Sequence, residues 1–93
     1  SSSTVSGSGD PGDYSTLKSG DSGDAVTRLQ ERLADLGYFY VNPTGNYLDV
    51  TVQCVKDFQL LNGMAATGIA DPETQALLFS DEAIPRNTES SQS

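Results

Sequence analysis

The sequence predicts an all-α fold: a compact three-helix bundle built from repeated loop–helix units, with flexible termini. Two observations carry this prediction. The phrase TGNYLDVT at 44–51 is echoed 23 residues later by TGIADPET at 67–74, and apolar residues recur at steps of three and four in three segments. Both phrases place a Thr-Gly turn before an acidic residue and a Thr that opens an apolar stretch. This order is typical of a loop that leads into a helix.

One domain is expected, at residues 14–84 of the 93-residue chain. Residues 1–13 are almost entirely Ser, Gly, Asp and Pro, and residues 85–93 are mostly polar. Neither segment can bury enough apolar surface to offset the entropy lost on ordering it. We therefore expect a disordered linker or tag before the domain and a disordered tail after it.

The first helix is predicted from the apolar stripe that follows the turn at 21–24. Asp21 or Ser22 is expected to cap its N-terminus by accepting from backbone N–H groups. Gly37 is expected to end the helix in the left-handed conformation. The residues of the stripe are Val26, Leu29, Leu33 and Leu36.

The aromatic segment at 38–41 is predicted to be either a short extended stretch or the wall of a loop. If it is extended, alternation places Tyr38 and Tyr40 on one side and Phe39 on the other. Dense turn residues follow at 42–46.

The second and third helices are predicted from the two copies of the repeated phrase. Asp49 is expected to be the N-cap of the second helix, which ends at 62–63. Asp71 is expected to be the N-cap of the third helix, with Pro72 at the first helical position. The predicted inward residues are Thr51, Cys54, Val55 and Phe58 in the second helix and Thr74, Leu77 and Leu78 in the third.

Two glutamines occupy matching places in the predicted helices. Gln30 follows Leu29 and Gln59 follows Phe58, each directly after an apolar anchor. We interpret each glutamine as a side chain that reaches a carbonyl and an N–H group of a neighbouring loop, and so fixes the turn that follows its helix.

Composition argues against an enzyme. The chain has no His and a single cysteine, so neither a nucleophile–base pair nor an ordinary zinc site can be assembled, and no catalytic residue, metal or cofactor is expected. The carboxylate pairs Glu31/Asp35 and 81–82 are expected to be solvated surface, and Cys54 a small buried residue. A net charge of −8 disfavours nucleic acid as a partner, and no apolar run is long enough to insert into a membrane.

Two ordered sets of residues resemble the two halves of peptidoglycan-binding-like domains, and the resemblance covers about residues 17–78. It implies a non-catalytic three-helix module that targets an attached cell-wall hydrolase to murein. The first set is Leu17, Gly20, Asp21, Gly23, Val26, Leu29, Gln30, Leu33, Leu36 and Gly37. The second set is Gly45, Tyr47, Thr51, Cys54, Val55, Phe58, Gln59, Asn62, Gly63, Gly68, Ile69, Pro72, Thr74 and Leu77.

The loops depart from the family pattern more than the helices do. Thr44 and Thr67 stand where the family commonly has Asp, Leu48 and Asp71 where a second Gly is frequent, and Cys54 where a small Ala is usual. This drift favours an alternative function, an interaction or spacer domain that has kept the fold and packs on a neighbouring catalytic domain without binding glycan.

If murein is the ligand, recognition needs an aromatic surface together with side-chain amides. The candidate ligand-binding residues are Tyr38, Tyr40, Asn42, Asn46, Tyr47 and Asn62. The alternative is that Phe39 and Tyr47 are core residues and that Asn62 caps a helix.

The partners implied by the resemblance are the glycan or stem peptide of peptidoglycan and a neighbouring catalytic domain of the same protein. An acidic module cannot attract an anionic polymer by net charge, so one copy should bind weakly and rely on avidity. We expect a monomer that acts outside the cell or in the bacterial envelope, with any export signal outside this fragment.

Overall fold

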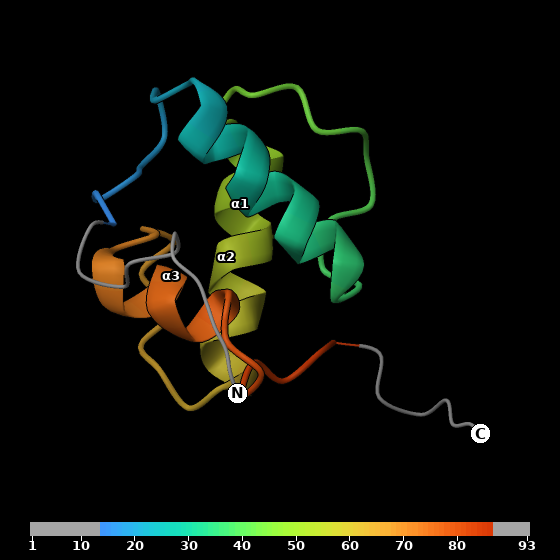
Figure 1. Ribbon diagram of the computed structural model, residues 1–93, viewed down its shortest axis with the longest axis vertical. Coiled ribbons are helices and arrows are strands. Elements are labelled where there is room, and N and C mark those ends of the chain that lie inside the picture. The colour runs from blue at the N-terminus through green and yellow to red at the C-terminus, as the bar shows by residue number, and fades with distance from the viewer. Residues whose placement is uncertain (1–13, 87–93) are drawn as a thin grey trace, which may run out of the picture.

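The computed structural model describes residues 14–86, so the predictions for 1–13 and for 87–93 concern residues outside the described range. Within 14–86 the chain forms three α-helices and no strand: α1 (Asp24–Asp35), α2 (Asp49–Leu61) and α3 (Pro72–Leu78). Figure 1 shows α1 crossing α2, and α1 also contacts α3. The prediction of an all-α three-helix bundle is confirmed.

The predicted stripes supply the core. Each helix turns its predicted stripe inward, with Leu36 and Leu77 partly buried at the margin, whereas Leu60 and Leu61 at the end of α2 are exposed. The loops and the segments that flank the helices add further buried side chains. The core consists of Leu17, Val26, Leu29, Leu33, Tyr38, Phe39, Tyr47, Cys54, Val55, Phe58, Ala70, Leu78 and Ala83.

The predicted N-cap of α1 is wrong. Gly23 is the N-cap residue, and no side chain bonds to the first turn. The carboxylate of Asp21 instead accepts from the backbone N–H of Lys18 at 2.9 Å and closes the preceding turn. The predicted end of the helix is confirmed, because Gly37 follows with a φ of 90°.

The caps of α2 and α3 differ from each other. In α2 the N-cap is Leu48, so the prediction of Asp49 is wrong by one residue; Asp49 is the first helical residue, where its charge favours the helix dipole. In α3 the prediction is confirmed, since Asp71 Oδ1 accepts from Thr74 N–H at 2.9 Å and Pro72 opens the helix.

The segment before α1 runs past both repeated loops. Leu17 pairs with Ala70 through two backbone hydrogen bonds, of 3.0 and 2.9 Å. Ser22 forms a second isolated antiparallel bridge with Asn46. These bridges fasten the loop before α2 and the loop before α3 to one stretch of backbone.

The segment at 38–41 wraps the end of α1 and is not extended. The N–H groups of Tyr38 and Phe39 both bond to the carbonyl of Leu33, at 2.8 and 3.2 Å. The adjacent side chains of Tyr38 and Phe39 therefore both turn inward, whereas Tyr40 and Val41 face solvent. The predicted alternation, with Tyr38 and Tyr40 on the same side, is wrong.

The chain after α3 returns to the ends of α1 and α2. The backbone N–H of Arg86 bonds to the carbonyl of Leu36 at 2.9 Å. The described chain is thus bonded to the bundle as far as Arg86. Among the described residues, no helix is both long and apolar enough to cross a membrane.

Candidate functional site

The buried side chain of Gln30 on α1 holds the loop between α1 and α2. Its Nε2 donates to the carbonyl of Asn46 at 2.7 Å and to the hydroxyl of Thr51 at 2.9 Å. Its Oε1 accepts from the backbone N–H groups of Thr44 and Gly45, at 3.1 and 2.9 Å. One side-chain amide therefore satisfies four polar groups of this loop and of the helix that follows it.

Gln59 repeats this arrangement for the loop between α2 and α3. Its Nε2 donates to the carbonyl of Ile69 and to the hydroxyl of Thr74, both at 3.1 Å. Its Oε1 accepts from the N–H of Gly68 at 3.0 Å. Three partners of the two glutamines correspond across the 23-residue repeat; the fourth is the Thr44 N–H for Gln30 and the Thr67 hydroxyl, at 3.3 Å, for Gln59. The prediction that both glutamines fix loops through a carbonyl and an N–H group is confirmed.

Tyr47, one of the predicted ligand-binding residues, lies in the core with 1% of its surface exposed. Its hydroxyl donates to the carbonyl of Gly68 at 2.6 Å and joins the first repeated loop to the second. Burial raises the pKa of this hydroxyl well above its usual value. The alternative, that Tyr47 is a core residue, is the one that the structure matches.

Tyr38 is also buried, with 1% of its surface exposed. Its ring packs edge-to-face on Phe58, with ring centroids 5.5 Å apart, and its hydroxyl donates to the carbonyl of Ile84 at 2.5 Å. Burial raises its pKa. Neither Tyr38 nor Tyr47 offers an open ring face to a sugar, so we remove both from the candidate surface.

Asn62 is the C-cap of α2, as the alternative for this residue predicted. Its side-chain Nδ2 donates to the carbonyl of Phe58 at 2.8 Å, and its Oδ1 accepts from the N–H of Ile84 at 2.9 Å. Both ends of the amide are thus engaged within the domain.

The remaining candidates, Tyr40, Asn42 and Asn46, are exposed and lie on the connection between α1 and α2. Tyr40 is the most exposed large apolar residue of the described chain, at 72%, and Val41 beside it is 44% exposed. Figure 1 shows this connection arching away from α1 before it reaches the start of α2. Gln30 holds the backbone of this connection at 44–46, so Asn46 lies in the held part and Tyr40 and Asn42 lie just before it.

The described residues contain no group of three His, Cys, Asp or Glu side chains that could hold a metal ion. The pairs Glu31/Asp35 and 81–82 are exposed, as predicted. Cys54 is buried, with its thiol on the carbonyl of Tyr38 at 3.0 Å, and burial raises its pKa to about 11. A thiol that stays protonated at neutral pH is a poor nucleophile.

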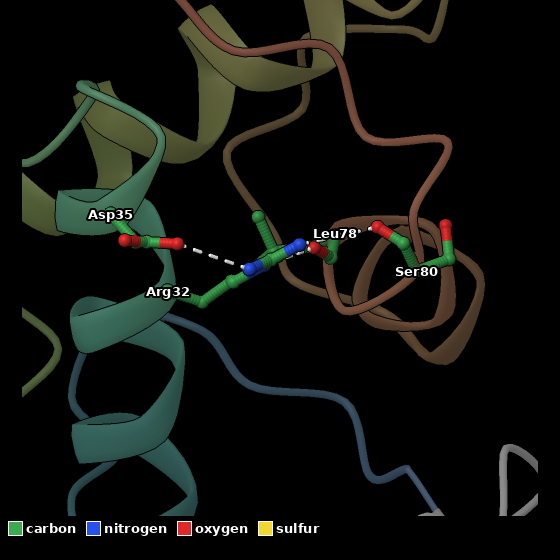
Figure 2. Close-up of polar contacts among 4 residues, drawn as sticks. All are labelled: Arg32, Asp35, Leu78 and Ser80. Atoms are coloured by element: carbon green, nitrogen blue, oxygen red, sulfur yellow. Dashed lines mark hydrogen bonds and ion pairs between the residues drawn. The ribbon is translucent and has the colours of Figure 1, made fainter. Parts of the chain in front are cut away.

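Sequence reasoning missed the role of Arg32. Its Nε donates to the carbonyl of Leu78 at 2.8 Å and its Nη2 to the carbonyl of Ser80 at 3.2 Å, while Nη1 pairs with Asp35 (Figure 2). The guanidinium thereby joins α1 to the end of α3. The sequence does not distinguish this arginine from the basic residues that are common in the last turn of a helix.

Comparison with known proteins gives a family match. The model of the family described as "Putative peptidoglycan binding domain" matches residues 22–78, which span all three helices. No curated protein sequence gives a significant match to the chain.

Three solved structures are similar to the chain. The endolysin of Burkholderia phage AP3 has a TM-score of 0.70 and 35% identity over 80% of this chain. The N-terminal domain of SleB has a TM-score of 0.66 and 28% identity over 68%. A fused Zn-dependent amidase/peptidase/peptidoglycan-binding domain-containing protein from Clostridium acetobutylicum has a TM-score of 0.67 and 29% identity over 74%.

The chain spans very different shares of these proteins. It covers 86% of the SleB domain but only 28% of the endolysin and 32% of the amidase/peptidase. In the two longer proteins the matching region is therefore one part among others.

Proposed function

This chain belongs to the peptidoglycan-binding domain family, and from that membership we propose that it binds murein without catalysing a reaction and holds an attached cell-wall enzyme near its substrate. The observation that carries the proposal is the family match over 22–78, which includes every helix of the bundle. The amidase/peptidase, which is named for its fused peptidoglycan-binding domain, supports the role of an attached module.

The chemistry of the side chains supports a binding role over a catalytic one. The sequence has no His, and the thiol of its single cysteine is buried. The carboxylate pairs Glu31/Asp35 and 81–82 are exposed to solvent. Any catalysis in a longer protein would then belong to another domain.

We place the contact with murein on Tyr40, Asn42 and Asn46. An exposed tyrosine ring can pack on the C–H face of a sugar, and side-chain amides can pair with hydroxyl and acetamido groups. A held loop loses little entropy on binding, which favours such a shallow site. We further propose that the domain is a monomer that acts outside the cell or in the bacterial envelope, where murein lies.

Co-sedimentation with purified insoluble murein at physiological salt tests this proposal. We expect weak pelleting of the single domain and much stronger pelleting of a protein with two copies in tandem, because the second contact becomes intramolecular. If both proteins stay in the supernatant, murein binding is wrong.

The connection between α1 and α2, which carries Tyr40, is here called the Tyr40 loop. Exposed apolar side chains outside this loop favour a second function. Leu60 and Leu61 at the end of α2 are 64% and 47% exposed, which suits a domain that packs on a neighbour. As a spacer, the domain would raise the melting temperature of the enzyme attached to it and would show no glycan-induced NMR shifts. Murein pelleting by the isolated domain contradicts this alternative.

A further inference from the structure

The bundle holds residues 83–86, here called the tail segment, by its main chain. The N–H of Ile84 donates to Asn62 Oδ1 at 2.9 Å, and its carbonyl accepts from the Tyr38 hydroxyl at 2.5 Å. Asn62 Nδ2 lies 3.5 Å from the same carbonyl. The N–H of Arg86 donates to the carbonyl of Leu36 at 2.9 Å. We call the three groups of the bundle, the Leu36 carbonyl, the Tyr38 hydroxyl and the Asn62 amide, the main-chain clamp.

The clamp bonds to backbone N–H and carbonyl groups, which every peptide has. Each of these hydrogen bonds uses a backbone atom of the tail segment, and the Asn62 amide faces both the N–H and the carbonyl of one residue. A side-chain amide that pairs with both polar groups of one residue recognises an extended backbone whatever its sequence. These hydrogen bonds therefore do not depend on the side chains of the tail segment.

Side-chain burial adds a preference for a small residue. Ala83 is buried against the core, at 9% exposure, whereas Ile84, the next residue, is 43% exposed. A larger side chain at the first position would have to displace core atoms, while the second position tolerates many shapes. The clamp thus fits an extended peptide with alanine first and a freely chosen residue second.

The charges beside the clamp are mixed. Burial is the main cause that raises the pKa of the Tyr38 hydroxyl; Asp57 on α2 adds to the rise and Arg86 of the tail segment opposes it. Asp57 directly precedes Phe58, on which the Tyr38 ring packs, and an acidic group there suits a ligand that carries an amine.

We propose that the main-chain clamp is a binding site for the stem peptide of murein, and that the tail segment occupies it from within until that peptide displaces it. This proposal rests on the proposed function, because it names the part of murein that the domain reads. Stem peptides are short, contain alanine, present successive amide groups and in many murein types carry an amine. The site is distinct from the Tyr40 loop, which would meet the glycan.

An internal occupant lowers the apparent affinity by the fraction of molecules in which the clamp is open. Loosening the tail segment while leaving the clamp intact should therefore tighten peptide binding. Ile84→Pro removes the N–H that bonds to Asn62 and changes no residue of the clamp. Ile84→Ala keeps this N–H and is the matched control.

The test is an NMR titration of the whole 93-residue chain with two probes, the free murein tetrapeptide and chitotetraose, which carries no peptide. We expect the tetrapeptide to shift the Asn62 side-chain amide and the backbone amides of Ile84 and Arg86. In Ile84→Pro, where residue 84 has no amide, the Asn62 and Arg86 signals report binding. We expect its affinity to be about five- to tenfold higher than that of Ile84→Ala. Adding Asn62→Asp to Ile84→Pro should abolish this gain, because the amide donor is lost.

Equal affinities for Ile84→Pro and Ile84→Ala, or no shift at the clamp in any variant, overturn the proposal. Should Ile84→Pro fail to fold, Ala83→Gly loosens the tail segment by removing the buried methyl group and must raise affinity in the same way. Shifts caused by chitotetraose alone, or murein pelleting without a tetrapeptide response, reject the clamp while leaving murein binding intact.

Discussion

The guanidinium of Arg32 on α1 caps the far end of α3 through the carbonyl of Leu78, with a distance of 2.8 Å between Nε and the oxygen (Figure 2). The carbonyls at the end of a helix lack partners within the helix, and a cation placed there also meets the negative end of the dipole. A single side chain thus joins α1 to α3 through two residues that are 46 positions apart in sequence.

Arg32→Met should therefore destabilise the domain. The substitution keeps much of the apolar stem but leaves the carbonyls of Leu78 and Ser80 without this donor. Because the side chain is 28% exposed, water can replace part of the lost bonding, and we expect a loss of about 1–2 kcal/mol in the free energy of unfolding. Urea denaturation measures it. Arg28→Met, at an exposed arginine of the same helix, is the control and should change stability by less than about 0.5 kcal/mol.

Removing either buried glutamine should cost more. Gln30→Ala leaves the N–H groups of Thr44 and Gly45 and the carbonyl of Asn46 without their partner, and we expect a loss of about 2–4 kcal/mol. Gln59→Ala should lose a similar amount, because its contacts repeat those of Gln30. Gln53 lies exposed on α2, so Gln53→Ala is the matched control and should be nearly neutral. Comparable losses in all three variants would contradict the role given to the buried pair.

Stability should fall in alkaline solution, and Cys54 should account for part of the fall. Burial raises the pKa of its thiol from about 9 in an exposed thiol to about 11. Between about pH 9 and pH 11 the thiol loses its proton in the unfolded chain but keeps it in the folded chain. Deprotonation therefore stabilises the unfolded state relative to the folded state, and the free energy of unfolding falls. The slope is at most about 1.4 kcal/mol per pH unit for one proton. Thermal melts between pH 8 and pH 10.5 should show a shallower decline for Cys54→Ala than for the parent chain, whatever the stability of the variant at neutral pH.

Two glycines that share a positive φ should differ sharply in their tolerance of a side chain. A Cβ added at Gly68 would meet Val52 Cγ1 at 2.8 Å, whereas one added at Gly63 would enter open space. Gly63→Ala should cost only the backbone strain, about 1 kcal/mol, and Gly68→Ala clearly more. Chemical denaturation measures the free energy of unfolding of both variants. Equal losses would mean that the Val52 side chain can move aside at no cost in stability.

Tyr40→Ala should weaken pelleting with murein without affecting the fold. The loss of one exposed stacking ring corresponds to about 1 kcal/mol, or roughly a fivefold weaker apparent affinity. Leu60→Ala removes a side chain of similar exposure from the last turn of α2, outside the proposed contact, and should bind as the parent does. Parallel melting curves ensure that any difference reflects contact with murein.

The helices were predictable because each one shows its buried face as a stripe in the sequence. Gln30 and Gln59 were also predictable, since a polar residue at a matching place after an apolar anchor needs a partner wherever it is buried. Tyr38 was misplaced because alternation holds only for an extended chain, and the shared Leu33 carbonyl bends this segment around α1. The N-cap of α1 was misassigned because Asp21 had a nearer partner in Lys18.

Arg32 and the tail segment could not be predicted in the same way. Arg32 donates to backbone carbonyls, and the tail segment is held through its own backbone atoms. Every residue carries such backbone groups, so no side-chain pattern indicates these contacts. They appear only once the fold has brought distant stretches of main chain together.

Gln30 fixes the backbone of its loop without bonding to the outward side chains, so the shape of this loop does not depend on those side chains. The amide of Gln30 grips only main-chain atoms of the loop ahead of α2, and Thr51 below it is part of the helix. Outward side chains such as Asn42 can thus be exchanged in a combinatorial library while the backbone keeps its course. If murein meets this loop as proposed, such a library would change the ligand that the domain selects without changing its fold.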